Sequence, residues 1–148
     1  TELTESAQPV ELAELARGVA AEYAQAAVDS GHELSVDAPQ ACVINGHAVL
    51  LQIALRNLVE NALQHTPSGT CIDVAVRPRP PTLEVSDDGP CAPSGAASSH
   101  AGLGLGLGHQ VVQRIAAVHD ARFERPEQPE RGRRSYRIVF EPPARPGA

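Results

Sequence analysis

The stretch that decides the fold is Leu51-Gln52-Ile53-Ala54-Leu55-Arg56-Asn57-Leu58-Val59-Glu60-Asn61-Ala62. Its apolar residues recur at helical spacing and predict a stripe that packs into the core, made of Leu51, Leu55, Leu58 and Ala62. We expect one helix over residues 47–65. The turn Asn45-Gly46 precedes it, and Thr66-Pro67 ends it, because a residue before proline disfavours the helical region.

A second, polar stripe runs along the same predicted helix at positions i, i+3, i+4 and i+7: Asn57, Glu60, Asn61 and Gln64. A solvated helix face explains such a stripe. Asparagine is a poor helix former, however, so two of them four residues apart are unusual for solvation alone. An asparagine oxygen is also a hard, neutral ligand that Mg²⁺ accepts beside phosphate oxygens. From these residues alone, both readings stay open.

Elements of alternating type surround this helix. Upstream we expect a helix from Pro9 to Asp29, with its buried face at Leu12, Leu15, Ala16, Val19, Tyr23 and Ala26. A pair of strands over residues 33–37 and 41–44 follows it. Downstream we expect a hairpin over residues 70–77 and 82–86, a loop over 91–101, a helix over 109–119, and strands over 121–125 and 134–141.

This order of elements predicts the fold class. Strands in pairs interleaved with single helices are typical of an α+β protein, here a two-layer α/β sandwich. We expect a mixed, mostly antiparallel sheet with three helices on one face. The length suits a single domain over residues 1–148, with its core at about 10–141.

Composition excludes several functions. The net charge is -6 and the chain contains no lysine, so a nucleic-acid partner, a Schiff-base lysine and a lysine-tipped phosphate loop are not expected. Cys42, Cys71 and Cys91 form no CxxC pair, which argues against a zinc site or a disulfide framework. No apolar run reaches the roughly 18 residues of a membrane span. Because the sequence has no Met, we expect residue 1 to lie within a longer chain.

A second candidate element, Asp87-Asp88-Gly89-Pro90, follows the predicted strand 82–86. Acid-Gly-Pro sequences form many ordinary turns. Alternatively, one carboxylate stands at the rim of a pocket and accepts a hydrogen bond from an exocyclic amine, while Gly89 lets the backbone approach a flat ring. This motif alone is weakly specific.

A third element is a run of glycines at every second position that opens onto the predicted helix 109–119: Gly102, Gly104, Gly106 and Gly108. Glycines in this number are costly in backbone entropy, and amides at a helix N-terminus hold anions. No strand leads directly into the run and no βαβ unit surrounds it, so it does not fit the dinucleotide-binding pattern. The run therefore favours phosphate binding in some other fold.

Taken in order, the three elements resemble the ATP-binding domain of sensor histidine kinases. Residues 51–62 resemble the N box of that family, Asp87-Asp88-Gly89-Pro90 its first glycine box, and residues 104–108 with the following helix its second glycine box. The resemblance covers about residues 10–141. It implies the Bergerat fold of the GHKL superfamily, shared with gyrase, the heat-shock chaperone and mismatch-repair ATPases.

The resemblance also implies roles for single residues. Asn61 would hold the Mg²⁺ that bridges the ATP phosphates, with Asn57 towards the triphosphate as the catalytic position. Asp87 would bind the adenine amino group, with Gly89 beneath the base. The glycine run, with Leu105 and Leu107 between its glycines, would surround the phosphates. His65 would belong to the pocket wall, Gln64 would stand where the family often has a basic residue that touches the phosphates, and Ser135 would join the adenine network through water.

Function and partners follow from the same resemblance. Related ATPases carry a glutamate base where this chain has Asn57, and an amide cannot take a proton from water. The expected activity is therefore transfer of the γ-phosphate of ATP to a histidine on a separate dimerisation domain, for relay to a response regulator. We expect the fragment to be a monomeric cytoplasmic domain, without the dimerisation and sensor domains and without direct membrane contact. The parent protein is expected in the bacterial inner membrane.

The chain departs from the family pattern at four places. Gln64 replaces a frequent basic residue, Cys91 replaces a glycine, the loop before the glycine run lacks a Phe-containing box, and His109 replaces an apolar residue. The alternatives are a degenerate module that acts through protein contacts and an anti-sigma-factor-type serine kinase. The remaining histidines, His32, His47, His100 and His119, are expected at the surface or at helix ends.

Overall fold

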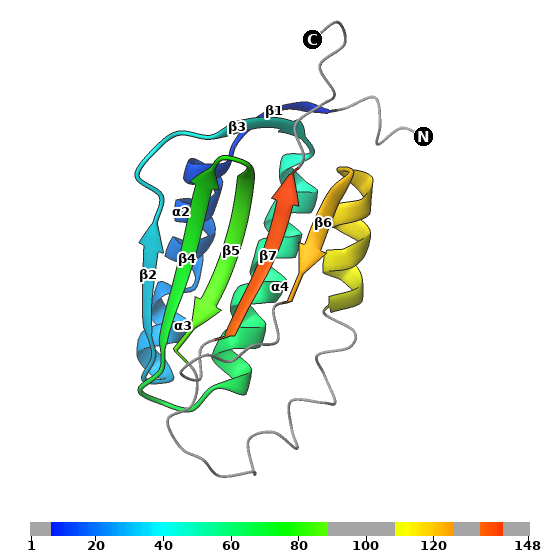
Figure 1. The fold of residues 1–148 in the computed structure, drawn as a ribbon. Coiled ribbons are helices and arrows are strands. Elements are labelled where there is room, and N and C mark those ends of the chain that lie inside the picture. Colours follow the sequence, from blue (N-terminus) through cyan, green and yellow to red (C-terminus); the bar gives the residue numbers. More distant parts are fainter. Residues whose placement is uncertain (1–6, 89–108, 126–133, 141–148) are drawn as a thin grey trace, which may run out of the picture.

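The computed structural model describes residues 7–88, 109–125 and 134–140. The helices of this part are α2 (Leu12–Glu22), α3 (Ala24–Asp29), α4 (Ala48–His65) and a helix over residues 109–118. The strands are β1 (Gln8–Glu11), β2 (Glu33–Asp37), β3 (Val43–Gly46), β4 (Cys71–Pro78), β5 (Pro81–Asp87), β6 (Ala121–Glu124) and β7 (Arg134–Phe140). The helices cover one face of the larger sheet (Figure 1).

The larger sheet has five strands in the order β2-β4-β5-β7-β6. Strands β2 and β4 run parallel, and the other three pairs are antiparallel. A separate two-stranded ribbon is formed by β1 and β3. The predicted two-layer α+β sandwich with a mixed, mostly antiparallel sheet is confirmed.

The core lies between α2, α4 and the sheet. The apolar stripe predicted for α4 is fully buried: Leu51, Leu55, Leu58 and Ala62 are all 5% exposed or less. It faces the apolar side chains of β4 and β5, including Ile72, Val74 and Leu83. The period of 3.6 in the helix and of 2 in the strands therefore identified the buried faces correctly.

The N-terminal helix differs from the prediction. Pro9 lies in β1, and the first helix begins at Leu12, because the Glu11 carboxylate accepts hydrogen bonds from the Ala13 and Cys42 amides at 2.9 and 2.8 Å. These bonds hold the pKa of Glu11 below its usual value, the bond from Cys42 foremost. The helix also breaks at Tyr23, where ψ is 7°.

The break at Tyr23 shifts the helical phase. Ala27 is buried, whereas Ala26, which the uninterrupted pattern assigned to the core, is exposed. The three predicted helices are therefore four helical segments within the described residues.

The expected pairing of the strands between the first two long helices is also wrong. Strand β2 pairs in parallel with β4, with Leu34 opposite Ile72, and β3 pairs with β1, with Ile44 opposite Val10. Helix α4 provides the crossover that a parallel pair requires. Alternation along a short segment predicts a strand, but it does not indicate the partner.

Histidines fix both ends of α4. At its start, the His47 amide donates to Nε2 of His119 (3.0 Å), and His119 Nδ1 donates to the Ile115 carbonyl (2.8 Å). At its end, buried His32 bonds Thr66 through Nε2 at 2.8 Å. His32 and His119 were expected at the surface or at helix ends: both lie just after a helix, His32 is buried, and His119 is half-buried and links two helices.

Candidate functional site

A small hollow lies where α4 ends, β5 ends and β7 begins. It is lined by Asn61, Ala62, His65, Thr66, Asp87, Arg134 and Tyr136. Three of the predicted site residues, Asn61, His65 and Asp87, therefore come together from α4 and β5. They meet because the C-terminal turn of α4 packs beside the end of β5 that carries Asp87.

The structure gives the two consecutive aspartates different environments. Asp87 is the last residue of β5 and is only 3% exposed. Asp88 is exposed and continues the pairing with β4: its carboxylate accepts from the Cys71 amide (3.0 Å), and its amide donates to the Cys71 carbonyl (3.2 Å). Asp88 thus secures the end of the hairpin, and Asp87 lines the hollow.

Asn61 lines the hollow with an unused polar atom. Its Nδ2 is buried and has no hydrogen-bond partner among the described residues. A buried amide without a partner costs about 1–3 kcal/mol, so its presence is explained best by a bound group that completes it. Because the amide can turn over, the same position can present its oxygen, the donor that Mg²⁺ prefers.

The other members of the polar stripe point elsewhere. Asn57 is half-buried and its Nδ2 donates to the Ile53 carbonyl of its own helix (2.9 Å). Glu60 accepts a hydrogen bond from the Tyr23 hydroxyl, and this bond and above all burial raise the pKa of Tyr23. Gln64 is exposed. Neither Asn57 nor Gln64 lines the hollow. Of the four residues of the polar stripe, Asn61 alone lines it.

The glycine-rich candidates lie outside the described residues. They are Gly89, Gly102, Gly104, Leu105, Gly106, Leu107 and Gly108, and the departure at Cys91 lies there too. The description resumes at His109, which is already helical. Residues 109–118 form a helix, in agreement with the helix predicted over 109–119.

Sequence reasoning did not find three of the lining residues, Thr66, Arg134 and Tyr136. Arg134 stands opposite Asp87 in the β5–β7 register, and Tyr136 stands opposite Val85. The signal that could have found them is this register, which local alternation does not contain. Ser135, expected to join the adenine network, is half-buried opposite Ser86 in the same register.

His109 is a buried polar residue next to this site, 4% exposed. Its Nδ1 lies 3.0 Å from Nη1 of Arg125, and its ring centroid lies 5.0 Å from that of Tyr136 and 5.6 Å from that of Phe123. Burial lowers the pKa of His109, and the charges of Arg125 and His65 lower it further. The imidazole is therefore neutral near pH 7, with its proton on Nε2, because Nδ1 accepts from Arg125.

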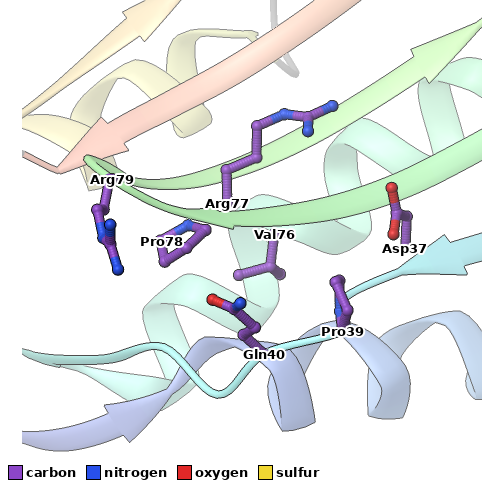
Figure 2. A pocket seen from close by; sticks show the side chains of 7 residues that line it. All are labelled: Asp37, Pro39, Gln40, Val76, Arg77, Pro78 and Arg79. Atoms are coloured by element: carbon purple, nitrogen blue, oxygen red, sulfur yellow. The ribbon is translucent and has the colours of Figure 1, made fainter.

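A second hollow opens at the opposite end of the sheet, near the β4–β5 turn (Figure 2). It is lined by Asp37, Pro39, Gln40, Val76, Arg77, Pro78 and Arg79. Figure 2 shows the Arg77 guanidinium pointing away from Val76 and Gln40. Its Nε donates to Glu84 (3.2 Å), which also accepts from Arg137 (3.2 Å). None of the predicted site residues lines this hollow.

The described residues contain neither a metal-binding cluster nor a membrane-spanning helix. No cluster of three or more His, Cys, Asp or Glu side chains in this part of the chain is placed to hold a metal ion. Within the same residues, no helix has the length and apolar character that crossing a membrane requires.

Comparison with known proteins defines the class. Residues 46–146 match the family described as histidine kinase-, DNA gyrase B- and HSP90-like ATPase. The chain belongs to this family. Two curated relatives are sensor protein kinase PmrB of Pseudomonas aeruginosa, 36% identical over 132 residues, and sensor protein BasS of Salmonella typhimurium, 38% identical over 93 residues. These alignments cover 79% and 55% of this chain but 27% and 26% of the relatives.

Solved structures show the same fold. The cytoplasmic segment of histidine kinase QseC superposes with a TM-score of 0.74 at 22% identity, covering 92% of this chain and 78% of that one. The ATP-binding domain of PrrB from Mycobacterium tuberculosis gives 0.69 at 20% identity, covering 93% and 98%. The predicted ATP-binding domain of a sensor histidine kinase, with the Bergerat fold, is confirmed. The chain spans about a quarter of the length of the curated relatives.

Proposed function

We propose that this domain binds Mg-ATP in the hollow at the end of α4 and supplies the γ-phosphate to a histidine on a dimerisation domain of the same protein. The observation that carries the proposal is the convergence of Asn61, His65 and Asp87, three residues assigned to nucleotide binding from the sequence, around one hollow. The family and the sensor-kinase relatives supply the reaction class.

The roles within the site follow from what each group can do. The Asp87 carboxylate, held at the end of β5, accepts a hydrogen bond from the amino group of the base. With its side-chain amide rotated so that Oδ1 takes the place of the unpaired Nδ2, Asn61 would supply an oxygen to Mg²⁺. The ion adds positive charge beside the phosphate oxygens, which matters in a chain of net charge -6 without lysine. The roles that the family resemblance implies for Gly89 and the glycine run fall on residues outside the described part of the chain.

Asn57 separates phosphotransfer from hydrolysis. Asn57 does not line the hollow, its Nδ2 donates to the Ile53 carbonyl, and its side chain is an amide, which cannot remove a proton from water as the glutamate of related ATPases does at this position. Hydrolysis of ATP by the domain is therefore slow. The phosphoryl group passes to a positioned histidine, a reaction that depends mainly on orientation and electrostatics.

The partners follow from this reaction. They are the dimerisation domain that carries the acceptor histidine and the response regulator that receives the phosphoryl group. The parent is a membrane-anchored bacterial sensor whose cytoplasmic part includes this domain.

Calorimetric titration with a non-hydrolysable ATP analogue, with and without Mg²⁺, tests the site. Asn61→Ala removes the magnesium dependence of binding, and Asp87→Ala weakens binding by at least about tenfold through loss of a charge-assisted hydrogen bond. Asn45→Ala and Asp37→Ala change the same residue types at exposed positions of β3 and β2 and leave the affinity unchanged. Equal binding by all five proteins would overturn the assignment.

Phosphotransfer separates the proposal from its alternatives. The domain is mixed with radiolabelled ATP and the dimerisation domain of its parent, and the phosphorylated product is treated with acid. An acid-labile phosphohistidine supports the histidine kinase. An acid-stable phosphoserine supports the serine kinase, and absence of label despite nucleotide binding supports the module that acts through protein contacts.

A further inference from the structure

His109 carries a hydrogen-bond donor for which the fold provides no acceptor. Its Nε2 is buried and has no hydrogen-bond partner among the described residues, and the residue is 4% exposed. The other ring nitrogen is occupied by Arg125 at 3.0 Å, which places the proton on Nε2. A buried N–H without an acceptor is unfavourable, so this position calls for an explanation.

His109 does not itself line the hollow, but it packs against a residue that does. Arg125 follows β6 and contacts one edge of the imidazole, while Nε2 lies on the other side of the ring. The ring packs against Tyr136, which itself lines the hollow. His65, another lining residue at the end of α4, is close enough to lower the pKa of His109 when it is charged. Asn61 Nδ2 thus belongs to a lining residue of the hollow, and His109 Nε2 belongs to a residue that contacts the lining residue Tyr136.

We propose that the Nε2–H group of His109 donates a hydrogen bond to a ring nitrogen of the bound purine, and so makes His109 a base-reading residue of this domain. The inference rests on the proposed nucleotide site and specifies how that site selects its base. A purine offers unprotonated ring nitrogens beside the amino group that Asp87 accepts from, so one base can satisfy both residues.

The neighbours of His109 favour a base over a phosphate. Its ring packs against the aromatic rings of Phe123 and Tyr136, which also stack on each other, and a flat, weakly polar base matches such a wall. A phosphate group there would lose its hydration without gaining a charged partner, since the imidazole is neutral and Arg125 lies across the ring from Nε2.

The experiment compares ATP with its 1-deaza, 3-deaza and 7-deaza forms, each of which replaces one ring nitrogen by C–H. Affinities are measured by calorimetry for the wild type and for His109→Leu, which fills the site with the apolar residue type usual in the family. We expect His109→Leu to weaken ATP binding by about tenfold, which corresponds to the loss of one buried hydrogen bond. For the analogue that lacks the accepting ring nitrogen, the wild type and His109→Leu should bind with equal affinity.

Two further variants complete the design. His47→Leu makes the same substitution at the far end of α4 and leaves ATP affinity unchanged. Arg125→Gln alters an exposed residue, so it keeps the protein folded, and it frees Nδ1 to carry the proton part of the time. It is expected to weaken ATP binding less than His109→Leu does, and to affect the same analogue least.

The outcomes separate the inference from the proposed function. If the wild type does not bind ATP, the proposed function fails and the inference with it. If the wild type binds ATP but folded His109→Leu binds it equally well, or loses affinity equally for ATP and all three analogues, only the inference is overturned. Should His109→Leu not fold, the Arg125→Gln result decides: no selective change among the analogues contradicts the proposal.

Discussion

Gly46 and Gly18 offer the same substitution with opposite expected signs. A Cβ atom at Gly46 would lie 2.7 Å from Cδ2 and 2.8 Å from Nε2 of His119, whereas a Cβ at Gly18 meets nothing within 4 Å. His119 cannot swing aside freely, because its two ring nitrogens bond Ile115 and His47 and its ring packs on Phe140. Gly46→Ala must therefore break the link between the helix over 109–118 and α4.

The size of the effect follows from these contacts. Loss of the two hydrogen bonds of His119 costs about 1 kcal/mol each. Alanine in place of glycine offsets up to about 1 kcal/mol of this loss, because it restricts the unfolded chain. Gly46→Ala should therefore lower the free energy of unfolding by about 1–2 kcal/mol. Gly18→Ala lies at an exposed position inside α2 and should raise it by about 0.5–1 kcal/mol.

Urea denaturation followed by circular dichroism measures both values. A double variant, Gly46→Ala with His119→Ala, provides the control: without the imidazole the new methyl group meets no ring, so Gly46→Ala should cost nothing further. Equal destabilisation by Gly46→Ala with and without His119 would refute the steric reasoning, as would a Gly46→Ala protein as stable as the wild type.

Three further predictions concern stability. Leu55→Ala removes a side chain of zero exposure from the centre of the core and should lower the free energy of unfolding by about 3 kcal/mol in urea titration, whereas a loss below about 1 kcal/mol would place Leu55 outside the core. Thr66→Val removes the hydroxyl that bonds Ala62 and His32 and should lower the melting temperature, and an unchanged value would show that these bonds do not hold the end of α4. Burial above all, and the charge of nearby His47, keep the pKa of His119 below 6.5 although the Ile115 carbonyl and Asp120 act in the opposite direction. Because the unfolded chain then takes up the proton first, the free energy of unfolding should be greatest above pH 6.5 and fall as the pH drops through the pKa of folded His119. The fall with pH should be less steep in His119→Gln, and an equal pH dependence of the two proteins would exclude His119 as its cause.

Periodicity along the chain predicted most of the fold. The buried stripe of α4 and the hairpin of β4 and β5 could be read locally, because helix and strand periods repeat within one element. The apolar faces of these elements are buried because they pack into one core between the helices and the larger sheet. Strand partners could not be read in the same way, since β2 pairs with β4 across the whole of α4.

The N-terminal errors have one physical origin. The start of α2 depends on the Glu11 carboxylate reaching Cys42, a contact between residues distant in sequence. Such a contact has no local signature, so Pro9 was assigned to a helix although it belongs to β1. Tyr23 interrupts the helix while its hydroxyl bonds Glu60 of α4, again a tertiary contact.

The candidate site was predictable where a motif carries it. Asn61, His65 and Asp87 were named from the sequence and line one hollow. Arg134 and Tyr136 reach that hollow only through the register of β7 against β5, which depends on the folded sheet. The unpaired Nε2 of His109 could not be predicted, because its protonation follows from the contact of Arg125 with Nδ1, which exists only in the folded chain. The resemblance to the family indicates only that a histidine replaces an apolar residue at this position.

The central claim is that Mg-ATP binds at the end of α4 and not elsewhere on the domain. The most direct measurement is a nuclear magnetic resonance titration of the isotope-labelled protein with a non-hydrolysable ATP analogue and Mg²⁺, followed through backbone and side-chain amides. We expect the largest shifts at Asn61, His65 and Asp87, with the Asn61 side-chain signal responding to Mg²⁺ only when nucleotide is present. Shifts centred on Gln40 and Arg77 in the opposite hollow, or no shifts at all, would contradict the account.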